Sequence, residues 1–431
     1  MLGNFSRKLQ KQSGNSVNDL AQADAQATFK ASSRILTING GSSSIKFALF
    51  RANETLERSL SGKIDRMGLA DSTLSFHDFV TGERASQPIE TTSLGSAIAF
   101  LLDWLEERIG LKTLVAVGHR VVHGMQHTAP ELVTQQLLND LREIIDCDPQ
   151  HLPGEIELIE AFRSRQPSLL QFACFDTGFH CTMPRVAKML AIPRRFNEKG
   201  VRRYGFHGLS YTFLTQELVR LEDPAATSGR VILAHLGNGA SLAAVRDGKS
   251  IDTSMGFTPA AGVPMSTRSG DLDPGLFGYL SRTENLTAQQ FDHIVNHESG
   301  LIGVSETSSD MRDLLARESA DIRAAEAVEL FCYHVKKWIG SFVAVLGGLN
   351  TLVFAGGIGE NTPVVRSRIC SGLGCFGIEI DDIRNQSGSS VISTDSSPVT
   401  VRIVRTDEEV VIASFVREML GREVASIFPL P

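Results

Sequence analysis

The sequence predicts an α/β protein that contains two related domains. The chain has 431 residues, which is more than one ordinary hydrophobic core accommodates. Residues 34–50 and 230–248 each combine an apolar strand, a small turn with Asn-Gly and a second strand, which is the pattern of a tight hairpin. Helical patterns follow each hairpin, for example at 93–110 and 319–347. Strands alternating with helices indicate sheets covered by helices, and the repeated hairpin indicates two copies of one unit.

The last apolar segment, residues 401–420, is predicted to form a strand, a turn at Thr406–Glu409 and a helix. Either Thr406 or Asp407 could cap this helix, and acidic residues in its first turn are favourable. In a protein of two lobes, such a late helix is expected to pack back onto the first lobe.

The charge and composition of the chain exclude some classes of binding partner. The net charge is −7 with 42% hydrophobic residues, which argues against a nucleic-acid or anionic-membrane partner. Six cysteines form no C-x-x-C pair and no zinc-site spacing, as is typical of reduced thiols in a cytoplasmic protein. Residues 1–33 are rich in Gln, Asn, Ser and Ala and lack an apolar signal core. A disordered extension is favoured there over a transit peptide.

Residues 338–359 are long enough to span a membrane, but their sequence does not predict a transmembrane helix. Residues 338–359 carry no charge, but Gly347, Gly348 and Asn350 interrupt them. A helix end, a turn and a buried strand at 351–355 are predicted instead.

The first hairpin turn, residues 39–46, reads NGGSSSIK. Backbone N–H groups at glycine, serine hydroxyls and a lysine suit phosphate oxygens and the water shell of a metal ion. An ordinary hairpin turn is the alternative, and the Walker pattern is absent.

Two charged residues lie in or directly after apolar strands. Arg120 stands inside the apolar run 115–124, where an unpaired charge would be costly, so it needs an anion from either the protein or a ligand. Asp176 ends another apolar strand, where a carboxylate suits magnesium ligation, the positioning of a reacting group, or the capping of the next turn.

Three further segments carry candidate site residues. His207 lies between glycines on a loop, where an imidazole can approach a ligand or serve a structural role. Arg268 is the only cation in residues 251–275, a long loop with four Gly and three Pro. Residues 351–361 read as a buried strand, a glycine-rich turn and a helix start, which is a pattern typical of nucleotide sites.

Eight motifs, taken in order, resemble those of the acetate kinases over residues 34 to about 420. These are NGGSSSIKF, GHRVVHG, FDTGFHCTMP, RRYGFHGLS, HLGNGAS, DTSMGFTPAAGVPMSTRSGDLDPG, FAGGIGEN and TDEEVVIA. The resemblance implies two duplicated ribonuclease-H-like domains of the actin-like ATPase class, with a cleft between them. It places the first domain at 34–176 plus about 406–425, and a second, nucleotide-binding domain at 177–405.

The resemblance also implies roles for matched positions. Two arginines would hold the carboxylate and then the phosphoryl group, and His207 would donate a hydrogen bond to that group. The catalytic residues would be Asn39, Arg120, Asp176, His207 and Arg268. Asn39 and Glu408 would position the metal, with Ser42 and Ser44 in the first phosphate loop. The substrate-binding residues would be Arg120, Val122, His151, Phe206 and Pro259. The nucleotide-binding residues would be Lys46, His235, Leu236, Gly237, Asn238, Gly239, Asp310, Met311, Arg312, Gly357, Ile358, Gly359, Glu360 and Asn361.

The implied reaction is direct transfer of the ATP γ-phosphoryl group to acetate, with Mg²⁺ or Mn²⁺, by a cytoplasmic homodimer. Positioning and charge stabilisation carry such a transfer, since the attacking carboxylate is already an anion. Propionate or butyrate as the acid is the nearest alternative, and a non-catalytic nucleotide-binding protein is a distant one.

Three positions depart from the family pattern. Gln150 stands where the family usually has Leu, and its amide could shrink or polarise the acyl pocket or point away from it. Tyr211 and Ser266 replace the usual His and Gly of their motifs.

Overall fold

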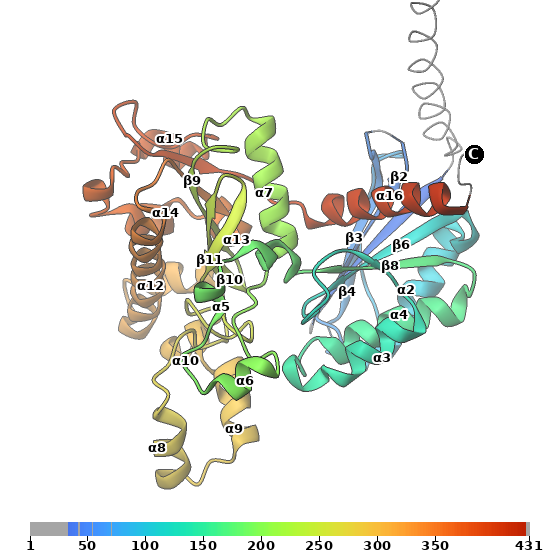
Figure 1. Ribbon diagram of the computed structural model, residues 1–431, viewed down its shortest axis with the longest axis horizontal. Coiled ribbons are helices and arrows are strands. Elements are labelled where there is room, and N and C mark those ends of the chain that lie inside the picture. The colour runs from blue at the N-terminus through green and yellow to red at the C-terminus, as the bar shows by residue number, and fades with distance from the viewer. Residues whose placement is uncertain (1–32, 42–43, 54, 70, 428–431) are drawn as a thin grey trace, which may run out of the picture.

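Two lobes, each built on one mixed β-sheet, make up the protein (Figure 1). The computed structural model describes residues 33–41, 44–53, 55–69 and 71–427. The expected N-terminal extension, residues 1–33, lies outside the described residues except for Ser33, and Ser42 lies outside them as well.

In the described chain, the first sheet has eight strands in the order β5-β4-β3-β2-β1-β6-β8-β7. Strands β1, β2 and β3 are antiparallel neighbours, and β6 and β8 continue the sheet parallel to β1. The strands are β1 (Arg34–Gly40), β2 (Ser44–Arg51), β3 (Arg58–Asp65), β4 (Thr73–Asp78), β5 (Arg84–Pro88), β6 (Leu114–Val121), β7 (Glu131–Leu132) and β8 (Leu170–Phe175).

The second sheet has five strands within the described residues, in the order β11-β10-β9-β12-β13. Strands β9, β10 and β11 are antiparallel neighbours, and β12 and β13 run parallel to β9. The strands are β9 (Arg230–Leu236), β10 (Ala240–Arg246), β11 (Lys249–Thr253), β12 (Thr351–Ala355) and β13 (Thr400–Ile403).

Both sheets therefore share one five-stranded pattern. The order β3-β2-β1-β6-β8 in the first sheet matches β11-β10-β9-β12-β13 in the second, with the same strand directions. The predicted fold of two duplicated α/β units of the actin-like ATPase class is confirmed.

Helices cover both faces of the first sheet, because successive strand residues point to opposite sides. Leu36 and Ile38 of β1 belong to one buried cluster with residues of α2 and α4. Ile35 faces the other way and packs with Ile412 and Val416 of the C-terminal helix α16. The helices of this lobe are α2 (Leu94–Ile109), α3 (Gln135–Glu143), α4 (Leu152–Arg165) and α16 (Glu408–Ile427).

The second sheet is covered in the same way. Ile232 of β9 packs with Phe331 of α12, whereas its neighbour Leu233 packs with Leu214 and Leu218 of α7. The remaining helices lie in or beside this lobe. They are α5 (Arg185–Lys188), α6 (Arg194–Glu198), α7 (Gly208–Arg220), α8 (Leu276–Thr283), α9 (Ala288–His293), α10 (Gly300–Ser305), α11 (Met311–Arg317), α12 (Ile322–Leu346), α13 (Gly356–Asn361), α14 (Pro363–Cys370) and α15 (Asp382–Ser387).

The chain passes between the lobes twice. Helix α7 comes after β8 of the first sheet, with α5 and α6 between them, and buries Leu214 and Leu218 against the second sheet. Helix α16 follows β13 of the second sheet but packs on the first, and the two helices contact each other. In Figure 1, α16 (red) spans the first lobe beside the blue strands. Two sequence-distant segments therefore meet where the lobes join.

The predicted elements agree with the structure apart from three boundaries, one of which is the end of β11 at Thr253, inside the predicted loop 251–275. Helix α16 begins at Glu408, inside the predicted turn, because Asp407 Oδ1 accepts the Val410 N–H at 3.2 Å and caps it. The glycine-rich segment after β12 was expected to be a turn and is instead the short helix α13. Gly356 makes the bend with a φ of 75°, and a Cβ there would lie 2.7 Å from Leu236 O.

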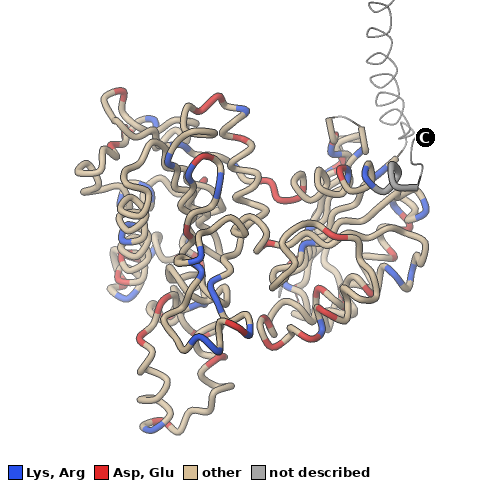
Figure 2. Tube along the Cα trace, viewed as in Figure 1, with Lys and Arg blue, Asp and Glu red and all other residues tan. Residues whose placement is uncertain are grey.

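Charged residues are distributed over both lobes. Figure 2 shows Lys and Arg interspersed with Asp and Glu along the chain of each lobe. No helix in the part of the chain that the structure describes is long and apolar enough to cross a membrane. The six cysteines all lie within the described residues and form no disulfide.

Candidate active site

A cavity of about 750 Å³ lies between the lobes, where the two hairpin turns and the carboxyl ends of the parallel strands meet. Residues of the first lobe that line it include Asn39, Arg120 and Glu408. His207 and Arg268 line it from the second-lobe side. The geometry follows from the fold, since ligands of open α/β sheets bind beyond the carboxyl ends of the strands.

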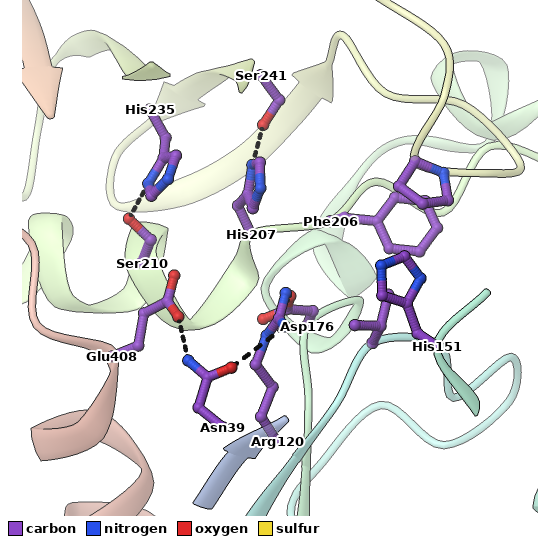
Figure 3. Close-up of polar contacts among 12 residues, drawn as sticks. Asn39, Arg120, His151, Asp176, Phe206, His207, Ser210, His235, Ser241 and Glu408 are labelled. Atoms are coloured by element: carbon purple, nitrogen blue, oxygen red, sulfur yellow. Dashed lines mark hydrogen bonds and ion pairs between the residues drawn. The ribbon is translucent and has the colours of Figure 1, made fainter. Parts of the chain in front are cut away.

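A chain of charged and amide groups crosses the first-lobe wall of this cavity (Figure 3). Arg120, near the end of β6, donates to Asp176 Oδ2 from Nε at 2.9 Å and from Nη2 at 2.5 Å. Its Nη1 donates to Asn39 Oδ1 at 3.3 Å, and Asn39 Nδ2 donates to Glu408 Oε2 at 2.8 Å. One connected network thus joins the ends of β1, β6 and β8 to the start of α16.

The charges of this network hold one another in place. Burial acts against the charge of Arg120, but the carboxylates of Asp176 and Glu408 outweigh burial and raise its pKa. Burial also acts against ionised Glu408, yet the charges of Arg120 and Lys46 outweigh it and lower the pKa of that carboxyl. The Arg120 guanidinium and the Glu408 carboxylate are therefore both ionised at neutral pH.

The acidic groups here fit a magnesium ion that shares its ligands with water and phosphate. Among the described residues, no group of three His, Cys, Asp or Glu side chains could hold a metal ion unaided. Magnesium typically takes only one or two carboxylates and completes its shell with waters and substrate phosphates. Asp176 Oδ1 is buried and has no hydrogen-bond partner within the described residues, but Asp176 does not line the cavity, so Glu408 is the carboxylate of this network that a metal ion can reach. Glu408 and Asn39 lie on the same wall.

Two stacked histidines form the opposite wall. The rings of His207 and His235 lie 4.4 Å apart, 25° from parallel. His207 Nδ1 lies 2.8 Å from Ser241 Oγ, and His235 Nδ1 lies 2.8 Å from Ser210 Oγ. Burial, together with the charges of nearby Arg120 and Arg268, lowers the pKa of His207 well below its ordinary value. Burial lowers the pKa of His235 to about 4. Both rings are therefore neutral at neutral pH.

A contact between the lobes fixes the second arginine. Arg268 Nη2 lies 3.3 Å from His151 Nε2, and His151 Nδ1 lies 2.8 Å from Asp148 Oδ1. Because Nδ1–H donates its hydrogen bond to the Asp148 carboxylate, Nε2 presents its lone pair to the guanidinium. Arg268 has no carboxylate within ion-pair distance in the described part of the chain, so its charge remains available to an anionic ligand.

Apolar residues line the cavity beside the arginines. Val122, Phe206 and Pro259, the residues predicted for the acyl pocket, line the same cavity as His151, and Figure 3 shows Phe206 beside His151. Gln150 is absent from this lining, and its Oε1 pairs instead with His297 Nε2 at 2.9 Å, beside a separate cavity next to α9. Of the three possibilities for Gln150, the amide points away from the acyl pocket.

Glycine turns and a short helix line the far end of the cavity. The turn at 237–239 closes with a hydrogen bond from Gly237 N to Gly239 O at 3.0 Å. Glu360 Oε1 accepts from Gly356 N at 2.9 Å and from Thr406 N at 3.1 Å, which ties α13 to the segment before α16. Backbone N–H groups at such turns suit phosphates, and an open glycine surface suits a nucleoside.

Most residues predicted for the site line this cavity. The exceptions are Leu236 and Gly359, whose positions are buried, and Asp176, which reaches the cavity only through Arg120. Sequence reasoning missed Lys63, Thr406 and Glu409, which also line it. Lys63 lies on β3 and carried no local motif. Thr406 and Glu409 belong to the motif TDEEVVIA, of which only Glu408 was assigned to the site. Treating every polar residue of that motif as a candidate would have found them.

The fold, with a cavity between two lobes of one duplicated pattern, is that of a two-lobed phosphotransferase. The chain belongs to the acetokinase family, whose model matches residues 34–414. It is therefore a phosphotransferase with a carboxyl group as acceptor and ATP as a substrate, as the sequence predicted.

Named relatives agree with this family. The chain is 40% identical over 403 residues to an acetate kinase of Methylocella silvestris, covering 91% of this chain and 99% of the relative. It is 42% identical over 390 residues to an acetate kinase of Rhodopseudomonas palustris, covering 89% of this chain and 97% of the relative. Among solved structures, a propionate kinase of Francisella tularensis has a TM-score of 0.83 at 35% identity, covering 89% and 98%. An acetate kinase of Porphyromonas gingivalis has a TM-score of 0.80 at 35% identity, and the match covers 90% of this chain and 100% of that structure.

Proposed function

We propose that this protein transfers the γ-phosphoryl group of ATP to acetate, giving acetyl phosphate and ADP, and that the reaction is reversible. The observation that carries this proposal is the placement of Arg120 and Arg268 on opposite walls of one cavity, beside an apolar recess. Arginine binds carboxylate and phosphate oxygens in a planar, two-point fashion, so both guanidinium groups suit acetate first and the phosphoryl group afterwards. Val122, Phe206 and Pro259 enclose the methyl group.

The nucleotide binds along the second-lobe wall. The glycine turn at 237–239, Asp310–Arg312 and the helix at 356–361 border a space that suits ADP, with the γ-phosphoryl group directed toward His207. Asp310 caps α11 and accepts from Arg312 N at 2.8 Å and from Arg312 Nε at 3.0 Å, so this edge of the nucleotide site is preformed.

The transfer is a single in-line displacement. An acetate oxygen forms a bond to the γ-phosphorus while the bond from that phosphorus to the β,γ-bridging oxygen breaks, and the electron pair leaves on ADP. No proton needs to move, because the nucleophile is an anion. Arg120, Arg268 and the neutral His207 stabilise the equatorial oxygens, which is the main contribution a protein makes to such a transfer.

Asn39 and Glu408 would hold the divalent ion, and Asp176 would orient Arg120. When bound, the ion neutralises charge that develops between the β- and γ-phosphates. Mg²⁺ is the proposed ion, and Mn²⁺ shares the same preference for oxygen ligands.

The domain division at 34–176 plus about 406–425 and at 177–405 is proposed as two bodies that close around ATP and exclude water. The Arg268–His151 contact, which joins the lobes, supports such a closure. A homodimer and a cytoplasmic location remain predictions from the family resemblance. Light scattering on the purified protein and fractionation of the source cells would check them.

The test is acyl phosphate formation measured as the hydroxamate, with ATP, Mg²⁺ and each of acetate, propionate and butyrate. The proposal predicts that acetate gives the highest kcat/KM. A preference for propionate would keep the mechanism and change the substrate, an outcome that the similarity to a propionate kinase makes specific. No turnover with any acid, together with tight ATP binding, would overturn the proposal in favour of a nucleotide-binding protein.

A further inference from the structure

His207 can help a phosphoryl transfer only if the correct ring nitrogen carries its proton. Its ring is neutral at neutral pH, so it has one N–H group, at either Nδ1 or Nε2. The Nε2 atom faces the cavity, since a Cβ built on Gly239 would lie 3.1 Å from it and 3.8 Å from Arg268 Nη1. His207 Nε2 forms no hydrogen bond to the part of the chain described. It is therefore the nitrogen that meets a ligand.

A buried hydrogen-bond chain runs behind the other nitrogen. Ser241 Oγ, on β10, lies 2.8 Å from His207 Nδ1 and 2.5 Å from the Tyr211 hydroxyl, on the first turn of α7. Tyr211 and Ser241 have no measurable exposure to solvent, and His207 is 9% exposed. These are the only hydrogen bonds of the Tyr211 and Ser241 side chains within the described residues.

Counting protons along this chain leaves one arrangement in which every buried donor is satisfied. The Tyr211 phenol keeps its proton because burial raises its pKa, and its acceptor is Ser241 Oγ. The Ser241 proton then has only His207 Nδ1 to receive it. If Nδ1 were protonated instead, the hydroxyl proton of either Ser241 or Tyr211 would be buried without an acceptor, which is costly. The accepting nitrogen is thus Nδ1, and the proton of the ring lies on Nε2.

We propose that Ser241 and Tyr211 are positioning residues, which fix the His207 tautomer that donates from Nε2 to the transferring phosphoryl group. The donation to phosphate rests on the proposed function, whereas the tautomer does not. Tyr211 is one of the three positions where this chain departs from the family pattern, which usually has His there, so the arrangement is a property of this sequence. The Ser241 hydroxyl donates a hydrogen bond to Nδ1, and the Tyr211 phenol donates to Ser241 Oγ, so that the Ser241 proton has no acceptor other than Nδ1.

The tautomer is measurable by NMR of the full-length protein labelled with ¹⁵N at its histidines. Protonated and unprotonated ring nitrogens have well-separated ¹⁵N shifts, and His207→Asn assigns the signal. We expect Nε2–H in the wild type, and a second tautomer to appear in Ser241→Ala and in Tyr211→Phe. Tyr204→Phe is the matched control, because it removes a buried phenol that donates to Gly200 O at 2.9 Å and leaves His207 untouched.

Kinetics with acetate then test the consequence. We expect kcat to fall about 10- to 100-fold in Ser241→Ala, and by a smaller factor in Tyr211→Phe, because partners that orient a reacting imidazole have effects of this size. The KM for ATP is expected to stay within about threefold, since neither side chain reaches the nucleotide. Tyr204→Phe should keep wild-type kcat.

The outcomes separate the two proposals. Nδ1–H in the wild type would overturn the inference whatever the turnover. Unchanged tautomer and unchanged kcat in both variants would overturn the positioning roles as well. A wild type that turns over no acid, but has Nε2–H at His207, would refute the proposed function while leaving the tautomer assignment in place.

Discussion

The hairpin turns that face each other across the cleft arise from the same strand pattern but present different chemistry. In the first lobe, Asn39 pairs with Lys46 across β1 and β2, and Asn39 joins the ionised network of Arg120 and Glu408. In the second lobe, the equivalent pair across β9 and β10 is His235 and Ser241, neutral groups that continue into a glycine turn.

This difference explains how one duplicated unit serves two purposes. A wall of paired charges is suited to hold a metal ion and to receive a transferring group, because its ions already compensate one another. A wall of neutral rings and backbone N–H groups is suited to polyphosphate, because it donates hydrogen bonds without adding buried charge. The two arginines differ in the same sense. Arg120 is paired with Asp176, whereas Arg268 is held by neutral groups.

The largest expected effect on kcat/KM comes from replacing either of the two arginines in the cavity. Arg120→Ala and Arg268→Ala should each lower kcat/KM by about 10³-fold or more, since transition-state arginines in phosphoryl transfer have effects of this size. The hydroxamate assay with acetate and ATP measures it. Activity within tenfold of wild type in either variant would show that the two walls do not share the transferring group.

Stability should distinguish the two arginines where activity does not. Arg120→Ala leaves the fully buried Asp176 carboxylate unpaired and should lower the free energy of unfolding by about 3–5 kcal/mol. Arg268→Ala removes a cation without such a partner and should leave stability unchanged or higher. Urea denaturation measures both. The double variant Arg120→Ala/Asp176→Ala should recover most of the loss, and equal destabilisation by both single variants would contradict the comparison.

The neutral wall should resist acid. Burial lowers the pKa of His235 to about 4 and that of His207 well below its ordinary value, so protonation requires a pH well below the ordinary histidine range. We expect the side-chain NMR signals of both rings to be flat from pH 8 to about 5 and to shift only below it. An inflection near pH 6.5 for His235 would contradict a neutral wall at physiological pH.

The smallest effect concerns the choice of acid. Val122→Ala enlarges the recess by two methyl groups and should raise kcat/KM for propionate relative to acetate by about tenfold, the usual worth of a methylene in a pocket. Gln150→Leu is the control, because its amide pairs with His297 outside the recess. Competition assays with both acids measure the ratio. A shift from Gln150→Leu as large as that from Val122→Ala would show that the amide influences the pocket.

Local patterns in the sequence were sufficient for the duplicated hairpins and the strand at 351–355, whereas most of the residues that line the cavity were predicted from the resemblance to the acetate kinases. Asn-Gly turns and apolar periodicity are local, and a carboxylate after a buried strand reaches the same sheet edge wherever the strand lies. The direction of Gln150 was not predictable, because it depends on His297, far along the chain. The pairing of Arg120 with Asp176 and the hydrogen bond of Tyr211 to Ser241 were not predictable for the same reason. Each joins segments that lie far apart in the sequence.

The most direct test of the division between the walls is the affinity for ADP, measured by calorimetry, in the double variant Arg120→Ala/Asp176→Ala. The account predicts a Kd within about threefold of wild type, together with undetectable acyl phosphate formation, because the nucleotide is held by the second-lobe wall. A loss of ADP affinity parallel to the loss of turnover would contradict it, and would assign nucleotide binding to the charged wall as well.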